Sequence, residues 1–171
     1  FTSDGKSLLT TSSDGSVRRA PLDAPEEAFR EVAWMAGRWP YVAIPGTNRL
    51  IVGSPLAIHD RSSGALIKTI STARYHAAAV SSDGRFAAAA STTQLGVWEI
   101  ATGEQILRVD LKRKPILGVD FSPNNSQLAV VGYDGTWSCM DVVEIATGTL
   151  ARYTVRENWS RRGLFVADNG L

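Results

Sequence analysis

The sequence predicts an all-β fold in which a four-stranded antiparallel unit repeats along the chain. A turn signal recurs five times, as FTSDG at 1–5, AIPG at 43–46, VSSDG at 80–84, FSPNN at 121–125 and VADNG at 166–170. Its spacing of about 40 residues is typical of a repeat architecture. Each full period holds four short segments rich in Val, Ile, Leu and Ala, separated by turn-forming residues. Helical periodicity is almost absent from the chain.

The expected strands follow one order in the second, third and fourth periods. First strands are predicted at 41–44, 76–80 and 116–121, and second strands at 49–53, 85–91 and 127–132. Third strands are predicted at 56–60, 95–100 and 136–145, and fourth strands at 65–70, 104–109 and 149–155. Gly64, Gly103 and Gly148 follow the third strands, where a tight turn into the fourth strand needs unusual backbone angles.

One segment, Asp23–Trp34, favours two structures. Asp23, Pro25 and Glu26 resemble the start of a helix, and the apolar residues that follow have helical spacing. Its place in the period is that of the fourth strand of the first repeat. We expect a strand, because repeat register usually outranks local propensity; a short helix there would leave the predicted fold intact.

Composition excludes several classes of protein. The 171 residues contain 18 basic and 17 acidic side chains, so net charge points to no particular partner. Cys139 is the single cysteine, which excludes an internal disulfide and a cysteine-based metal site and fits a reducing compartment. The sequence contains no apolar run long enough to cross a membrane as a helix. Because Phe1 begins in the middle of a repeat signal, we expect the chain to be part of a longer polypeptide.

The stretches VSSDGRFAAAASTTQLGVWEIATG and FSPNNSQLAVVGYDGTW…VVEIATG resemble WD-repeat proteins. Repeats of that family typically run from a turn SPDG through a strand, a DG turn and a strand ending in Trp-Asp, to TG. Trp98-Glu99 is the best anchor, with Glu in place of the usual Asp. The family also places a Gly-His pair before the first strand, and neither His59 nor His76 sits at that position. The residues that match the repeat pattern are Asp14, Asp60, Asp83, Trp98, Glu99, Asp134 and Glu144.

The resemblance implies a β-propeller, in which four-stranded sheets stack as blades around a central channel. We expect residues 1–171 to form a single partial propeller. Its repeats should cover approximately 1–37, 38–73, 74–113 and 114–156, with the start of another at 157–171. The two ends of the chain repeat the same turn instead of completing one blade. The sequence therefore predicts about four blades' worth of a ring of roughly seven, with a closed four-bladed ring as the alternative.

A search for catalytic and cofactor motifs finds none. The sequence lacks H-E-x-x-H, G-x-S-x-G, G-x-x-x-x-G-K and G-x-G-x-x-G, and it contains two histidines, too few for a histidine-rich metal site. We expect no enzymatic activity in this region, no cofactor and no metal, although a catalytic domain could be attached outside it. Asn124 and Asn158 match the glycosylation sequon, but Asn124 and Asn125 are better explained as turn residues.

The connections from each fourth strand to the next first strand share an unusual composition. They read WMAGRWP at 34–40, STARY at 71–75, KRKP at 112–115 and ENWSRR at 157–162, and Glu157 is their only acid. If the register is right, all of them lie at one end of the propeller. The candidate partner-binding residues are Trp34, Arg38, Trp39, Arg74, Tyr75, Lys112, Arg113, Lys114, Trp159, Arg161 and Arg162. The competing interpretation is of solvated cations above packed aromatic rings.

A cationic and aromatic face suits an acidic protein partner. We expect a protein-interaction scaffold or sensor module of a larger multidomain signalling or effector protein, which binds an acidic or phosphorylated peptide or domain, in another protein or in the same polypeptide. Nucleic acid is disfavoured because the aromatic residues lack a base-stacking spacing, and no membrane partner is expected. The alternative is a propeller enzyme or small-ligand binder that uses the central channel. We expect a cytoplasmic location; secretion or a periplasmic location stays open because a targeting segment could precede Phe1.

Overall fold

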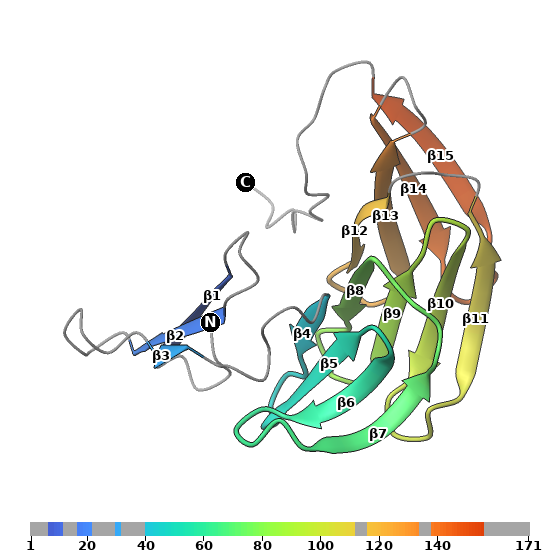
Figure 1. Ribbon diagram of the computed structural model, residues 1–171. Coiled ribbons are helices and arrows are strands. Elements are labelled where there is room, and N and C mark those ends of the chain that lie inside the picture. The colour runs from blue at the N-terminus through green and yellow to red at the C-terminus, as the bar shows by residue number, and fades with distance from the viewer. Residues whose placement is uncertain are drawn as a thin grey trace.

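The computed structural model describes residues 40–111, 116–133 and 138–155, together with three strands nearer the N-terminus (Figure 1). These three are β1 (Ser7–Thr11), β2 (Val17–Pro21) and β3 (Arg30–Glu31), which form an antiparallel sheet in that order. Strand β3 lies within the ambiguous segment 23–34 and pairs with β2 through Arg18 and Glu31. The strand interpretation is therefore confirmed for residues 30–31, and the rest of that segment lies outside the described residues.

Three four-stranded antiparallel sheets follow, each a simple meander. The first contains β4 (Tyr41–Ala43), β5 (Arg49–Gly53), β6 (Leu56–Asp60) and β7 (Leu66–Ser71). The second contains β8 (Ala77–Val80), β9 (Phe86–Ala90), β10 (Gln94–Glu99) and β11 (Gln105–Asp110). The third contains β12 (Ile116–Phe121), β13 (Gln127–Tyr133), β14 (Ser138–Glu144) and β15 (Leu150–Val155). All twelve strands lie where the turn pattern predicts them, and the described residues contain no helix.

Left-handed backbone conformations mark the turns on which the strand prediction depended. Gly64, Gly103 and Gly148 have φ values of 75°, 78° and 69°. The first-to-second turn of the third sheet has Asn125 at φ 58°, where the two preceding sheets have glycine. Asparagine tolerates this region better than most residues, which confirms the turn interpretation of Asn125.

The three sheets are arranged as successive blades of a propeller. First strands β4, β8 and β12 approach one another, and the sheets spread apart toward their outer strands β7, β11 and β15 (Figure 1). A sheet with apolar side chains on both faces must be covered on both, and stacking against neighbouring blades achieves this. The fold is that of a β-propeller.

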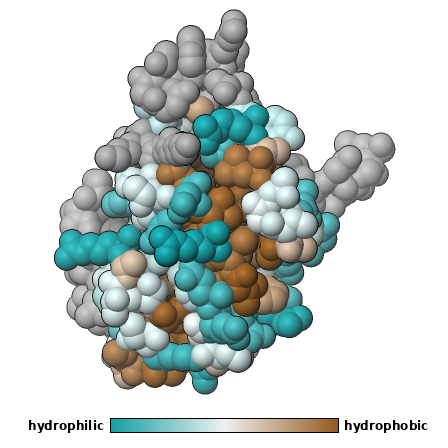
Figure 2. All heavy atoms as spheres, turned by 90° about the vertical axis from the view of Figure 1, so that its right-hand side faces the viewer, coloured by the Kyte–Doolittle hydropathy of each residue, from teal (hydrophilic) through white to brown (hydrophobic). Residues whose placement is uncertain are grey.

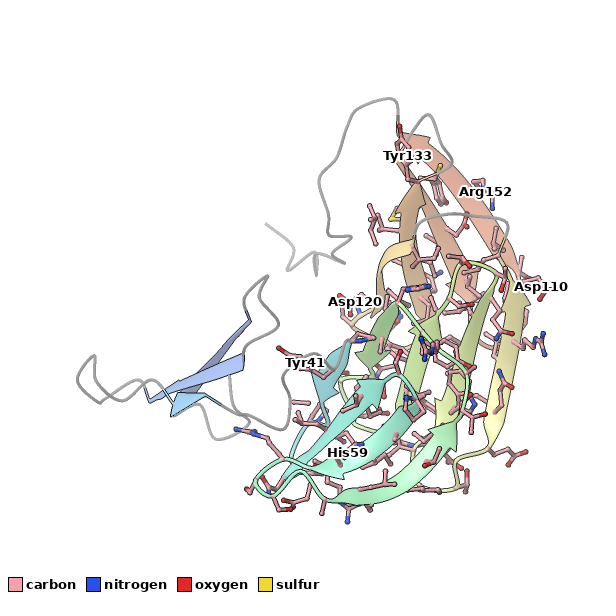
Figure 3. All side chains as sticks on the ribbon, viewed as in Figure 1. Tyr41, His59, Asp110, Asp120, Tyr133 and Arg152 are labelled. Carbon is pink, nitrogen blue, oxygen red and sulfur yellow. The ribbon has the colours of Figure 1, made fainter. Side chains whose placement is uncertain are left out.

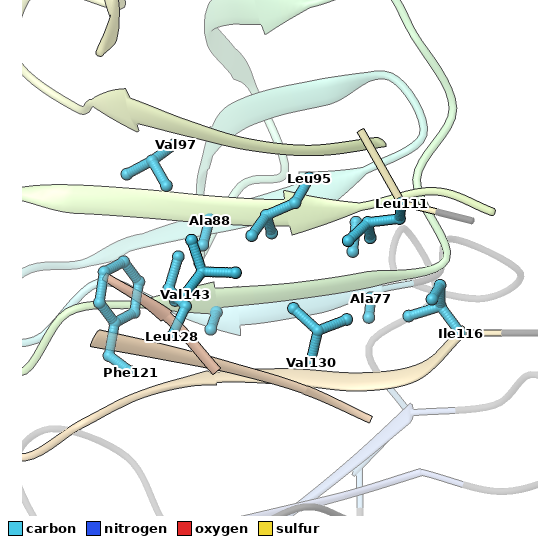
Figure 4. Packing of buried hydrophobic residues seen from close by; sticks show 12 residues of the cluster. Ala77, Ala88, Leu95, Val97, Leu111, Ile116, Phe121, Leu128, Val130 and Val143 are labelled. Atoms are coloured by element: carbon cyan, nitrogen blue, oxygen red, sulfur yellow. The ribbon is translucent and has the colours of Figure 1, made fainter. Parts of the chain in front are cut away.

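Two hydrophobic clusters fill the spaces between the three sheets. The first-interface cluster joins Ile44, Ile51, Leu56 and Ile58 of the first sheet to Tyr75 and to Ala87, Ala89, Trp98 and Ile100 of the second. The second-interface cluster joins Ala88, Leu95 and Val97 to Phe121, Leu128, Val130 and Val143 of the third sheet (Figure 4). Strand β9 contributes to both clusters, because its four alanines alternate between the two faces and are fully buried.

Candidate functional site

The ends of the outer strands define the candidate partner-binding end of the molecule. In a four-stranded meander the fourth strand ends at the same end of the sheet at which the first strand begins. In the second sheet, Asp110 at the end of β11 pairs with Gln94, and Ala77 at the start of β8 pairs with Ala90. Arg74 lies in the connection between β7 and β8 and is exposed. The other expected cations and the tryptophans lie outside the described residues: Trp34, Arg38, Trp39, Lys112, Arg113, Lys114, Trp159, Arg161 and Arg162.

Tyr75, one of the candidate partner-binding residues, is buried, as the competing interpretation of packed aromatic rings has it. Its side chain is only 4% exposed, and its ring packs edge-on against Trp98 with the ring centroids 5.5 Å apart. Its hydroxyl lies 3.2 Å from Ser71 Oγ, and its backbone N–H donates to the carbonyl of Gly53. The small side chains of Ala87 and Ala89 in the same cluster leave room for the ring. Tyr75 therefore anchors the connection that presents Arg74.

Trp98 lies on the same face of β10 as Gly96, two residues earlier. A Cβ atom added to Gly96 would overlap the indole ring, so the ring lies directly over this glycine. The indole is 4% exposed within the first-interface cluster. The sequence Gly-Val-Trp is thus a packing unit: the missing side chain at Gly96 makes the space that the tryptophan fills.

The acidic residue at the end of each third strand stabilises the turn that follows. Gly64, Gly103 and Gly148 donate their N–H groups to the carbonyls of Asp60, Glu99 and Glu144. The Asp60 carboxylate also accepts hydrogen bonds from Ser63 and Ser62, and these bonds, first that from the Ser63 backbone, hold its pKa below the ordinary value. Glu99 accepts a hydrogen bond from the Thr102 hydroxyl. These carboxylates are structural parts of the repeat.

Asp83 performs a similar task in the turn between β8 and β9. Its carboxylate accepts hydrogen bonds from the Ser81 hydroxyl at 2.6 Å and from the Arg85 N–H at 3.0 Å. The Ser81 bond is the main reason that the pKa of Asp83 is lowered, and the Arg85 charge contributes less. Asn124 makes the corresponding bonds in the next sheet, with the Ser122 hydroxyl and the Ser126 N–H. Asp14 and Asp134 lie outside the described residues.

His59 lies on β6 (Figure 3). By strand register it occupies the position in the first sheet that Trp98 occupies in the second. It is 7% exposed, and its Nδ1 lies 3.0 Å from the carbonyl oxygen of Gly64. The ring closes the same turn that Asp60 caps. Among the residues that the structure describes, no group of three or more His, Cys, Asp or Glu side chains is placed to hold a metal ion.

Two carboxylates that the sequence did not single out are partly or fully buried. Asp141 on β14 is completely buried and forms a bidentate ion pair with Arg152 on β15, with Nε–Oδ1 and NH2–Oδ2 distances of 3.0 and 3.3 Å. The two residues are direct cross-strand partners. The sequence could have predicted this ion pair once the hairpin register was assigned from the turn at Gly148. Asp120 lies on the inner strand β12 (Figure 3), where burial raises the pKa of its carboxyl despite a hydrogen bond from the Phe121 N–H.

Comparison with known families agrees with this geometry. Residues 104–141 match the family described as "WD domain, G-beta repeat", and the matched range runs from the start of the hairpin strand β11 to Asp141 on β14. This part of the chain is therefore similar to a WD40 repeat. The match ends three residues before Glu144, whose backbone carbonyl accepts the turn hydrogen bond that the carbonyl of Glu99 accepts in the second sheet.

A solved structure shows a similar architecture over most of the chain. Kuenenia stuttgartiensis hydrazine synthase is similar over 91% of this chain with a TM-score of 0.71 and 19% sequence identity. This chain spans 47% of that chain, and the likeness concerns the fold. No curated protein matches the sequence. Within the described residues, no helix has the length and apolar character needed to span a membrane.

Proposed function

We propose that this propeller segment is a protein-interaction scaffold or sensor module of a larger multidomain signalling or effector protein. WD40 repeats in general mediate protein–protein interaction, and the match at residues 104–141 supports that class of function. The specific proposal is that an acidic or phosphorylated protein segment binds the connector end, by which we mean the end of the propeller that carries the fourth-to-first-strand connections at 34–40, 71–75, 112–115 and 157–162. One observation carries it: the meander topology brings the ends of β7 and β11 and the starts of β8 and β12 to one end of the stacked sheets.

The described part of that end supplies a rigid base and an exposed cation. Tyr75 is fixed by its ring contact with Trp98 and by its backbone bond to Gly53, so the adjacent Arg74 projects from an ordered loop. The sequence KRKP at 112–115 follows directly after Leu111, which is buried in the second-interface cluster. Clustered cations raise the local concentration of an acidic partner and increase its association rate, and salt weakens both effects.

The proposal is tested with charge reversal of the cations at 112–114. Full-length protein and its K112E/R113E/K114E variant are applied to an array of acidic, phosphorylated and neutral peptides. Binding of acidic or phosphorylated peptides should fall by about tenfold or more in the variant, and its dependence on salt should become weaker. Arg108→Glu, an exposed cation in the middle of β11, is the matched control. Equal binding by the wild type and the triple variant would overturn the proposal.

The alternative function, a propeller enzyme or small-ligand binder that uses the channel, has one observation in its favour. Asp120 is a partly buried carboxyl on an inner strand, with a pKa raised by burial, and such groups are common at functional sites. Asp120→Asn separates the two functions. Loss of small-molecule binding with unchanged peptide binding would support the alternative, and unchanged small-molecule binding would remove it.

A further inference from the structure

A groove lies between the sheet of β4–β7 and the sheet of β8–β11, at the end opposite the connectors. It has a volume of about 320 Å³, near the lower end of the range for ligand sites. Its lining residues come from the turns after β4, β8 and β10 and from the neighbouring strands. They are Ile44, Thr47, Arg49, Ile58, Ile67, Lys68, Gly84, Arg85, Glu99, Ile100 and Ala101. All of them belong to the described part of the chain.

The groove combines an apolar floor with a cationic rim. Ile44, Ile58 and Ile100 are at most 9% exposed, and they belong to the first-interface cluster. Ile67 on the outer strand β7 is 46% exposed and lines the groove. Figure 2 shows that apolar atoms remain visible between polar side chains on this outer side of the molecule. The wall at Ile67 thus offers apolar surface to a partner.

Three cations line the groove against a single carboxylate. Arg49 and Arg85 are exposed, and neither guanidinium forms a salt bridge with a described residue; Arg85 lies 5.1 Å from the centre of the Phe86 ring. The Lys68 ammonium reaches across the gap between the sheets and donates one hydrogen bond, 2.9 Å long, to the carbonyl of Ala101. The carboxylate, Glu99, already accepts a hydrogen bond from Thr102. The guanidinium groups therefore have capacity for external acidic groups.

The equivalent positions in the next sheet show that these cations are not needed for blade packing. Phe86 takes the place of Arg49, because each follows a turn with the same closing hydrogen bond, from Ile44 to Arg49 and from Ser81 to Phe86. Leu107 takes the place of Lys68 by strand register. Phe86 and Leu107 pack against the second-interface cluster. Where the second interface is closed by apolar side chains, the first is lined by positive charge.

We propose that this groove binds an extended acidic peptide segment of a partner protein, with carboxylates at Arg49 and Arg85 and an apolar side chain against Ile67. The rim supplies charge complementarity, and the isoleucines supply apolar surface that an inorganic anion would not use. The groove lining contains no aromatic ring on which a nucleic-acid base could stack. This site is separate from the connector end, so it goes beyond the proposed function and does not depend on it.

The test uses fluorescence polarisation of the full-length protein with three labelled synthetic peptides. One alternates Glu and Leu, one contains Glu alone, and one alternates Gln and Leu. The Glu-Leu peptide should bind most tightly. R49E/R85E should weaken that binding by about tenfold or more, and Ile67→Asn should weaken it without changing the weaker binding of the all-Glu peptide.

Control variants separate this site from the connector end and from misfolding. Arg108→Glu should leave binding of the Glu-Leu peptide unchanged, and the neutral variant R49Q/R85Q should show an intermediate loss with an unaltered circular dichroism spectrum. Equal affinity of R49E/R85E and wild type would overturn the proposal. So would equal affinity for all three peptides, or an Ile67→Asn variant that binds the Glu-Leu peptide as tightly as the wild type. A loss confined to K112E/R113E/K114E would instead assign the binding to the connector end.

Discussion

The two interfaces between blades are packed by different side-chain chemistry. At the first, Trp98 fills the space above Gly96 and meets Tyr75 edge-on, over a floor of alanines. At the second, Val143 takes the position of Trp98, and Asp141 takes the position of Gly96 and binds Arg152. One interface therefore relies on a buried indole, and the other on mainly aliphatic packing beside an ion pair in which only the Asp141 carboxylate is buried. Repeat architecture fixes the backbone and leaves the packing solution free.

The largest expected effect is at the aromatic interface. Trp98→Ala should reduce the free energy of unfolding by about 3–5 kcal/mol, because it removes a buried indole and leaves a cavity between two sheets. Val143→Ala, at the equivalent position, should cost clearly less because fewer buried atoms are removed. Urea unfolding followed by tryptophan-independent circular dichroism measures both. Equal losses of unfolding free energy in the two variants would contradict the view that the first interface depends more on its large side chain than the second does.

The ion pair at the second interface should follow in magnitude. Arg152→Ala removes two charge-assisted hydrogen bonds from a carboxylate that has no solvent exposure, so a loss of about 1.5–3 kcal/mol in unfolding free energy is expected. Arg108, its counterpart on β11, is the matched control, since Gly96 lies opposite it. Arg108→Ala should change stability little. A loss as large in R108A as in R152A would contradict a special role for the buried pair.

A smaller effect is expected from adding one methyl group. Gly96→Ala should destabilise the protein by about 1–3 kcal/mol, because the new Cβ atom would overlap the indole of Trp98. The same change in a Trp98→Leu background should cost much less. A double-mutant cycle measures this coupling. Identical costs in both backgrounds would mean that backbone entropy or β-propensity causes the loss.

The smallest effect concerns the turns, where Asp83 in the second sheet is matched by Asn124 in the third. The pKa of Asp83 is lowered in the folded protein, so its contribution to stability is present above its ordinary value of 3.8 and is lost as the pH falls through the folded value. Asp83→Asn makes this turn like the next one and should reduce the loss of stability below about pH 4. Thermal unfolding of the wild type and of Asp83→Asn from pH 2.5 to 6 measures this effect. Superimposable profiles of stability against pH would contradict the prediction.

The strands could be predicted from the sequence because the turns carry their own chemistry. Glycine at left-handed positions and the spacing of Gly64, Gly103 and Gly148 fix where each hairpin reverses, and the strands follow. The sequence left two interpretations of Tyr75 open, because a connecting loop has no alternation to say which side chain turns inward; the structure supports the packed ring. The interface groove was out of reach. It depends on which residues of two different sheets come together, and that requires the packing of neighbouring blades.

The alanines of β9 have a further consequence for how the sheets depend on one another. Ala87 and Ala89 face one neighbour, Ala88 and Ala90 face the other, and all four are fully buried. Strand β9 is therefore thin over these four positions, with a single methyl group per position on either side. A larger residue anywhere on this strand would push one neighbouring sheet outward and shift the strand toward the other. Substitutions at the two interfaces should accordingly be non-additive wherever they alter the position of β9.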